Sequence, residues 1–172
     1  MSFEQAKDKL TIGSLDNTDL TVSAQYNPKE LQIDQNVPWK KPEAATKTGK
    51  QQGTGSSKDN PLEVEFTGAE GRTMTVEMLF DGYEPKGRAV DVSKMVADLT
   101  KMATVIDPES KNEQQRRPHH CVVSWGAKGI LPRFECVIES LSTKYSMFSG
   151  EGEPLRATCT VKLKEAKMKA KK

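Results

Sequence analysis

The segment from Leu155 to Leu163 constrains the fold of this chain more than any other. Apolar side chains fall there at every second position: Leu155, Ala157, Cys159, Val161 and Leu163. Because neighbouring side chains of a β-strand point to opposite faces of a sheet, this alternation predicts a strand with one buried and one wet face. The turn signal from Ser149 to Pro154 precedes it and follows a second apolar and aromatic run that ends at Phe148. The two runs are expected to form a β-hairpin.

Similar alternation predicts further strands along the chain. They lie at Leu20 to Tyr26, Leu31 to Ile33, Leu62 to Phe66, Met74 to Phe80, Val122 to Trp125 and Arg133 to Phe148. The strands at 62–66 and 74–80 are expected to pair as a second hairpin around the turn Gly68 to Gly71. One helix is predicted from Asp91 to Ala103, because apolar residues recur there at helical spacing and Asp91 or Ser93 can cap its first turn.

These elements predict an α+β, mainly β fold, a barrel or sandwich of hairpins with one packed α-helix. The edges of such a sheet must close into a barrel or be covered by neighbouring copies in a ring. A single domain is expected over residues 1–172, with a flexible insertion loop at about 40–61 and a basic tail at about 165–172. A lysine-rich tail is most often solvated, and docking onto an acidic neighbour is the alternative.

Composition argues against several classes of protein. The net charge is only +2, and the basic pairs Lys40-Lys41 and Arg116-Arg117 are too sparse to indicate a nucleic-acid partner. No apolar stretch is long enough to span a bilayer, so no direct membrane contact is expected. The N-terminus lacks a secretion signal, and three unpaired cysteines do not form a disulfide framework. Synthesis and folding in a reducing cytoplasm are therefore expected.

The sequence offers little chemistry for catalysis. His119, His120 and Cys121 are adjacent, but successive side chains of a strand diverge, so the prediction is no metal site; a metal-dependent enzyme using these residues is the alternative. Cys121 is expected to face Cys136 across a hairpin, as two core residues, as a disulfide or as half of a metal site. No nucleophile motif and no phosphate-binding or dinucleotide-binding glycine pattern is present. The chain is therefore predicted not to be an enzyme and to need no cofactor.

Six residues are candidates for contacts between subunits or for defining the fold. Trp39 and Trp125 are aromatic, and aromatic side chains commonly anchor interfaces. The last hairpin contributes the other four: Phe148, Pro154, Leu155 and Arg156. Arg156 lies on the predicted wet face of its strand and is available to pair with a carboxylate of a neighbouring subunit.

Several short motifs, taken in order, resemble one family. They are Tyr26-Asn27-Pro28-Lys29, Glu77 to Gly82, Val123 to Gly126, Phe134 to Tyr145, and Phe148 with Gly150 and Pro154 to Ala157. Their order and approximate spacing are similar to those of the tube and baseplate-hub proteins of contractile injection systems, which are relatives of phage-tail tube proteins. The resemblance extends from about Leu10 to Glu165.

The resemblance implies a structural role. Such proteins form hexameric rings that join the trimeric spike of the hub to the inner tube, so the implied partners are copies of the chain itself, the spike trimer, the inner tube protein and other baseplate components. The particle is released from a bacterium or attached to its membrane. Many hub adaptors carry a LysM-type module after this domain, and none is expected here.

Two other readings stay open at this point. The chain could be an inner tube or tube-initiator subunit of the same particle. It could also be a small β-barrel module that binds oligonucleotides or sugars.

Overall fold

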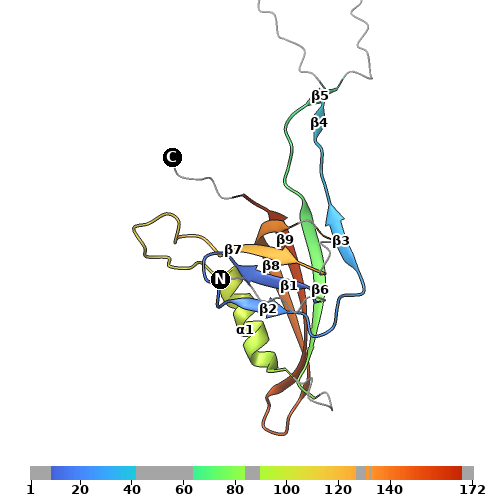
Figure 1. The fold of residues 1–172 in the computed structure, drawn as a ribbon, viewed down its shortest axis with the longest axis vertical. Helices are drawn as coiled ribbons and strands as arrows, with labels where there is room; N and C mark the ends of the chain where they lie inside the picture. Colours follow the sequence, from blue (N-terminus) through green and yellow to red (C-terminus); the bar gives the residue numbers. More distant parts are fainter. Residues whose placement is uncertain (1–8, 42–63, 84–89, 127–130, 132, 168–172) are drawn as a thin grey trace, which may run out of the picture. The chain divides into compact units, whose positions relative to one another are not determined.

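The structure is a computed structural model that describes residues 9–41, 64–83, 90–126, 131 and 133–167. Those residues form nine strands and one helix (Figure 1). The strands are β1 (Thr11–Ser14), β2 (Thr21–Ser23), β3 (Leu31–Asp34), β4 (Trp39–Lys40), β5 (Glu65–Phe66), β6 (Thr73–Asp81), β7 (His120–Ser124), β8 (Phe134–Phe148) and β9 (Pro154–Glu165), and the helix is α1 (Val92–Ala103). The predicted α+β, mainly β class is confirmed.

The chain divides into two compact units. The first unit comprises residues 1–34 and 71–172, and the second comprises residues 35–70. In the first, seven strands form one antiparallel sheet in the order β2-β1-β7-β8-β9-β6-β3, whereas β4 and β5 pair with each other in the second. The expectation of a single domain over residues 1–172 stays a prediction.

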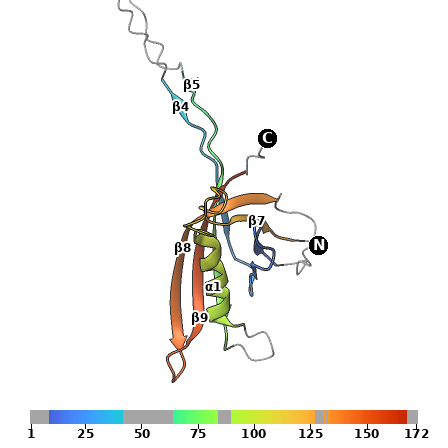
Figure 2. The same cartoon turned by 90° about the vertical axis from the view of Figure 1, so that its left-hand side faces the viewer.

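Strand β9 lies between β6 and β8 and pairs with both along most of its length. Figure 2 shows β8 and β9 running side by side with α1 next to them. The register sets Val76 of β6 opposite Val161 and Met78 opposite Cys159, so the apolar residues of both strands share one face. All of them are at most 1% exposed: Met74, Val76, Met78 and Phe80 of β6, and Ala157, Cys159, Val161 and Leu163 of β9. The hairpin predicted from the alternating C-terminal segment is confirmed.

Helix α1 covers this apolar face. Its buried side chains are Val92, Val96, Leu99 and Met102, the spacing expected for one helical stripe. The helix begins after Asp91, whose carboxylate accepts a hydrogen bond from the backbone N–H of Lys94 at 2.9 Å. Full burial of a residue such as Leu99 contributes about 1.5–3 kcal/mol to folding. The predicted helix and its cap are therefore confirmed.

Strand β8 changes both its partner and its buried face along its length. Its first four residues, Phe134 to Val137, pair with β7, and the later residues pair with β9 alone. A β-bulge between Ile138 and Ser140 separates the two parts. Before the bulge, even-numbered residues such as Cys136 face the core, and after it the odd-numbered Thr143 lies opposite the buried Cys159. The extra residue of the bulge causes this change of face.

The predicted hairpin between residues 62–66 and 74–80 is wrong. Strand β5 pairs with β4, with Trp39 opposite Phe66, whereas β6 pairs with β3 and β9. Alternation identifies a strand but not its partner, and β6 finds longer partners elsewhere in the sequence. Strand β1 was not predicted, because all four of its residues are buried and it shows no alternation.

Two predicted segments lie largely outside the described residues. The expected loop at about 40–61 begins with Lys40, which belongs to β4, and residues 42–61 are not described. The expected tail at about 165–172 begins with Glu165, the last residue of β9, and residues 168–172 are not described.

An ion pair joins the chain just before β6 to the end of β9. Atom Oε1 of Glu165 lies 2.8 Å from Nη2 of Arg72. Atom Oε2 accepts hydrogen bonds from Nε and from the backbone N–H of Arg72, both at 3.0 Å. The side-chain and backbone donors of Arg72 hold the pKa of Glu165 down to about 2. The carboxylate therefore stays charged in the folded chain well into the acidic range.

We expect acidification to reduce the free energy of unfolding, in part through Glu165. Its pKa is about 2 in the folded chain and 4.5 in the reference state, so the unfolded chain binds the proton first and the stabilisation is lost as the pH falls through this interval. The variant Glu165→Gln should lose about 1–3 kcal/mol at neutral pH and show a shallower acid dependence, measured by urea unfolding at several pH values. The control Glu139→Gln removes only the half-exposed pair with Lys162 and should change stability by less than about 1 kcal/mol. An unchanged acid dependence in Glu165→Gln would contradict the prediction.

Candidate assembly surfaces

The seven-stranded sheet has two edges. Its hydrogen-bonded order begins at β2 and ends at β3, with no β2–β3 pair among the described strands. Four of its strands, β8-β9-β6-β3, form a part whose outer strands are β8 and β3. An unpaired strand edge presents backbone N–H and C=O groups that can pair with another chain.

Beyond residue 137, strand β8 has a free edge. Strand β7 pairs only with residues 134–137, so from Ile138 to Phe148 the side of β8 away from β9 has no strand partner in the described chain. The carbonyl of Leu155 accepts from the N–H of Gly82 at 2.8 Å, so odd-numbered residues of β9 point their backbone groups toward β6 and even-numbered residues toward β8. In β8 the partners of those even residues include Ser142, opposite Thr160. The backbone groups of the alternate residues therefore point outward: Leu141, Thr143 and Tyr145.

Strand β6 has a shorter free edge on the other side of the four-stranded part. Strand β3 pairs only with residues 73–76 of β6. At Asp81 the side chain of Gln25 takes the place of a strand: its Nε2 donates to the Asp81 carbonyl at 2.9 Å, and its Oε1 accepts from the Asp81 N–H at 2.6 Å. By alternation, the backbone groups of Glu77 and Leu79 point the same way and have no described strand partner.

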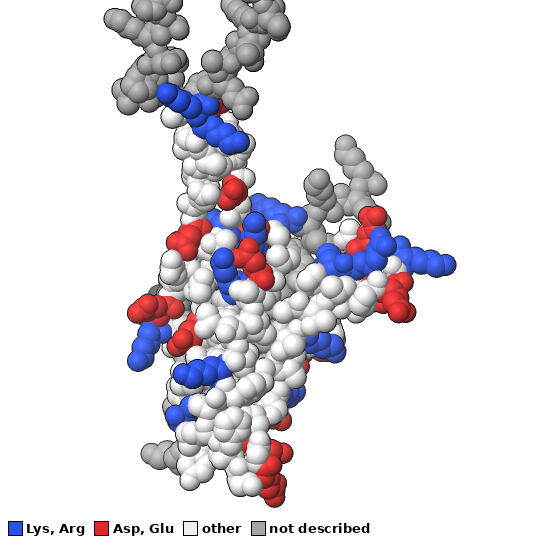
Figure 3. All heavy atoms as spheres, turned by 180° about the vertical axis from the view of Figure 1, so that it is seen from behind, with Lys and Arg blue, Asp and Glu red and all other residues white. Residues whose placement is uncertain are grey.

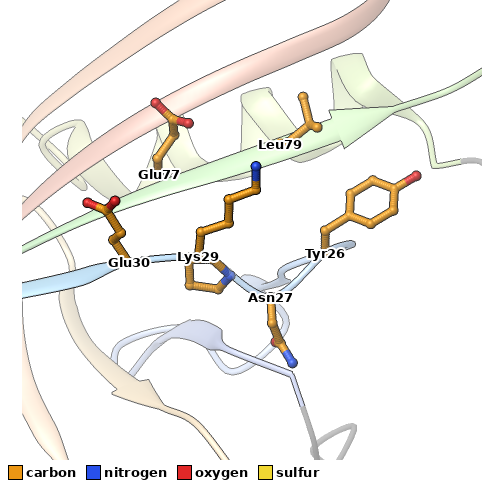
Figure 4. Close-up of a pocket in the computed structure, with 7 residues that line it drawn as sticks. Tyr26, Asn27, Lys29, Glu30, Glu77 and Leu79 are labelled. Atoms are coloured by element: carbon orange, nitrogen blue, oxygen red, sulfur yellow. The ribbon is translucent and has the colours of Figure 1, made fainter.

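A groove of about 410 Å³ lies along this edge (Figure 4). Residues 26–30 form one wall, and Glu77 and Leu79 of β6 form the other. The side chain of Lys29 points across toward β6, while Asn27 points away from it. The edge of β6 is thus accessible from this groove rather than covered by the core.

One face of the four-stranded part is polar. It carries the residues that alternate with the buried ones, and hydroxyl groups are frequent among them: Thr73, Thr75, Ser140, Ser142, Ser146, Thr158 and Thr160. Charged residues on this face are balanced, since Lys162 pairs with Glu139 at 3.0 Å and Arg156 with Asp81 at 2.6 Å. Acidic and basic side chains are mixed over the surface seen in Figure 3.

The structure places Arg156 in an ion pair within the chain. Both Nε and Nη2 of Arg156 donate to Oδ2 of Asp81, at 3.2 and 2.6 Å. The other oxygen of Asp81 accepts from the backbone N–H of Tyr83 at 2.9 Å. The Tyr83 N–H, followed by the Arg156 guanidinium, lowers the pKa of Asp81. A contact of Arg156 with a neighbouring subunit stays a prediction, and Asp81 is a partner that the sequence analysis did not find.

The other three candidate residues of the last hairpin, besides Arg156, lie near its turn. Phe148 ends β8, is 59% exposed and lies opposite Pro154, which begins β9. Tyr145 and Met147 are also exposed, and Met147 has a φ of 55°, which is uncommon for a residue with a side chain. Leu155 is half-buried, and its carbonyl holds the N–H of Gly82. The turn end of the hairpin therefore exposes apolar side chains.

The two tryptophans differ in environment. Trp39 belongs to the second unit and is 57% exposed, with its ring centroid 5.5 Å from that of Phe66. Val37, Val64 and Phe66 are also exposed there, so β4 and β5 present apolar side chains to solvent. Trp125 follows β7 in the first unit and packs, half-buried, against the core. Of the two, only Trp39 has the exposure expected of an interface anchor.

The residues of the His119-His120-Cys121 sequence diverge. Nδ1 of His119 lies 2.8 Å from the hydroxyl of Ser14, and Nε2 of His120 lies 2.8 Å from the carbonyl of Ala166. Burial lowers the pKa of His119, so its neutral form is favoured. No group of three potential metal ligands is found among the described residues. The histidines of this segment bond to neighbouring strands within the fold.

The described part of the chain contains no helix with the length and apolar character needed to cross a bilayer.

The family model described as contractile injection system tube protein matches residues 4–172. No curated protein matches the chain.

We expect substitutions of Arg156 to affect the folded chain itself. Arg156→Gln should lose about 0.5–1 kcal/mol, because the pair with Asp81 is partly exposed. Arg156→Glu should lose more, because it sets a second carboxylate beside Asp81. Urea unfolding of both variants measures the difference in the free energy of unfolding. The control is Lys144→Glu, because Lys144 lies on the same face of the sheet, on β8, and has no described ion pair. Equal stability of Arg156→Glu and the parent chain would contradict a structural role for this pair.

Proposed function

The chain belongs to the contractile injection system tube protein family, and from this we propose that it forms a hexameric ring of the baseplate hub that joins the trimeric spike to the inner tube. Membership makes it a tube-type structural protein, which associates with other components of the particle. The observation that carries the proposal of a ring is the pair of free strand edges on opposite sides of the β8-β9-β6-β3 part.

Both edges present backbone N–H and C=O groups that can pair with each other. Strand β8 offers the outward backbone groups of Leu141, Thr143 and Tyr145, and β6 offers those of Glu77 and Leu79 beside the groove. Pairing of the β8 edge of one copy with the β6 and β3 edge of the next would continue the sheet between subunits. Such a contact joins two different surfaces of the chain, and its repetition closes a ring when the rotation from one copy to the next divides a full turn. Closure pairs the β8 edge and the β6 and β3 edge of every copy.

The polar face of the same strands supports its assignment to the wall of the central channel. Its side chains are mainly hydroxyls and paired charges, such as Lys162 with Glu139. A surface of this kind remains hydrated and presents no large apolar patch to a passing chain. The opposite face is covered by α1, which therefore lies outside the wall of the ring.

The inner tube subunit is a second candidate. The description of the matching family as tube protein favours it, and the same edge pairing would serve a tube built from stacked rings. The hub role differs in its neighbours, since it requires contact with the spike. Exposed apolar side chains at the end of the hairpin and on β4 and β5 are available for such contacts, among them Phe148 and Trp39.

Proline substitutions test the edge pairing. Thr143→Pro removes an N–H that points away from β9, so β8 and β9 should still pair while the free edge is blocked. Ser142→Pro, its matched control, removes an N–H that points toward β9 and should destabilise the hairpin. Leu79→Pro and Met78→Pro form the corresponding pair on β6. We expect Thr143→Pro and Leu79→Pro to keep the parental circular dichroism and to lose self-association in native mass spectrometry; normal assembly of both would remove the edges from the interface.

Stoichiometry tests the place of the ring in the particle. Native mass spectrometry of the chain co-expressed with a spike protein should give complexes of two chains per spike subunit if the chain is the hub adaptor. Quantification of the chain in purified particles should then find as many copies per particle as one ring contains. Many copies per particle, without a spike complex, would identify an inner tube subunit instead.

A further inference from the structure

We propose that Cys121 and Cys136 are a redox pair, which an oxidising small-molecule disulfide such as oxidised glutathione converts to a cross-strand disulfide between β7 and β8. Both side chains are free thiols in the structure and are fully buried. This inference is independent of the ring proposed above, because it concerns two residues of one chain.

The register of the sheet brings the two cysteines together. Cys121 lies directly opposite Cys136 in the antiparallel β7–β8 ladder, and both face the core. The backbone groups of the residues before each cysteine show whether the two cysteines form a hydrogen-bonded or a non-hydrogen-bonded pair. The carbonyl of His120 accepts from the N–H of Leu15 at 2.7 Å, and that of Glu135 accepts from the N–H of Ala166 at 3.0 Å, so both point away from the ladder. The backbone groups of the two cysteines must therefore point toward each other.

This spacing permits a disulfide. Opposite residues that exchange backbone hydrogen bonds have Cα atoms about 5.5 Å apart, within the range in which disulfides form. Their Cβ atoms are about 4.5–5.5 Å apart, slightly more than the 3.5–4.5 Å of a relaxed disulfide. Closing the bond draws the two strands together locally, and bonds formed under such strain are more easily reduced. The pair is thus suited to reversible rather than permanent cross-linking.

The disulfide would lie in the ladder that connects two parts of the sheet. The strands β2, β1 and β7 are connected to β8, β9, β6 and β3 through the β7–β8 ladder alone in the described sheet. That ladder has four residue pairs, and Cys121 with Cys136 is one of its two inner pairs. A covalent bond there closes a short loop and restricts the unfolded chain, which stabilises the fold.

The chemistry balances by thiol–disulfide exchange. One cysteine, as its thiolate, attacks oxidised glutathione and forms a mixed disulfide, releasing one reduced glutathione. The second cysteine then displaces the other glutathione and closes the bond. The two cysteine thiols lose two electrons and two protons, and the oxidant takes them up as two thiols. Burial raises the pKa of Cys121 to about 12 and raises that of Cys136 as well, so the reaction proceeds through local opening of the ladder.

The third cysteine provides a control within the chain. Cys159 is buried on β9 and lies opposite Thr143, with its sulfur 3.7 Å from the hydroxyl of Thr143. It has no cysteine across the strand. Selective linkage of Cys121 to Cys136 therefore distinguishes register-directed pairing from general oxidation of buried thiols.

The experiment uses the reduced full chain and its Cys159→Ser variant, incubated with oxidised glutathione without denaturant until the mass is constant. Intact mass spectrometry should show the loss of two hydrogens in both, peptide mapping should find Cys121 linked to Cys136, and the melting temperature should rise by several degrees and return on reduction. Cys136→Ser should show no such loss. Cys121 and Cys136 both remaining free thiols at the end point, glutathione adducts without a Cys121–Cys136 link, or a link to Cys159 would overturn the proposal. Peptide mapping of the oxidised parental chain decides the matter even if a serine variant fails to fold.

Discussion

Two-sided pairing of β9 is the constraint on which the rest of the first unit depends. Its backbone groups alternate between β6 and β8, and its inward side chains, such as Cys159 and Val161, are fully buried beneath α1. Since both edges of β9 are used within the chain, its neighbours become the strands with free edges. The surfaces available for assembly therefore follow from the position of β9 in the sheet.

Whether a segment of strand edge is occupied or free depends on the side chains that lie beside it. At Asp81 the amide of Gln25 satisfies both backbone groups, and the carboxylate of the same residue binds Arg156. Two residues earlier, at Leu79, the described chain provides no such substitute. One end of β6 is therefore closed by a side chain, whereas its middle remains accessible from the groove. The contrast between Asp81 and Leu79 indicates that the unpaired segment of β6 is a feature of the fold.

The sequence predicted most of the elements but fewer of their partners. Alternation identified β6, β8 and β9, and helical spacing identified α1 with its Asp91 cap. It could not identify β1, which is buried throughout, or the pairing of β5 with β4, because a strand pattern carries no information on a distant partner. The interaction of Arg156 with Asp81 was missed for the same reason, since 75 positions separate the two residues. The opposition of Cys121 and Cys136 was predictable because one short hairpin fixes it.

The bulge in β8 has a consequence for changes in chain length. It exchanges the buried and exposed faces of the strand between Ile138 and Ser140, so every later residue depends on one extra position. Deletion of Ser140 would carry Leu141 and Thr143 to the hydrated side, whatever their chemical suitability. Insertions of two residues in each strand near the turn would preserve the faces and lengthen the hairpin by about 7 Å. The reach of this hairpin can therefore change among related chains only in such discrete steps.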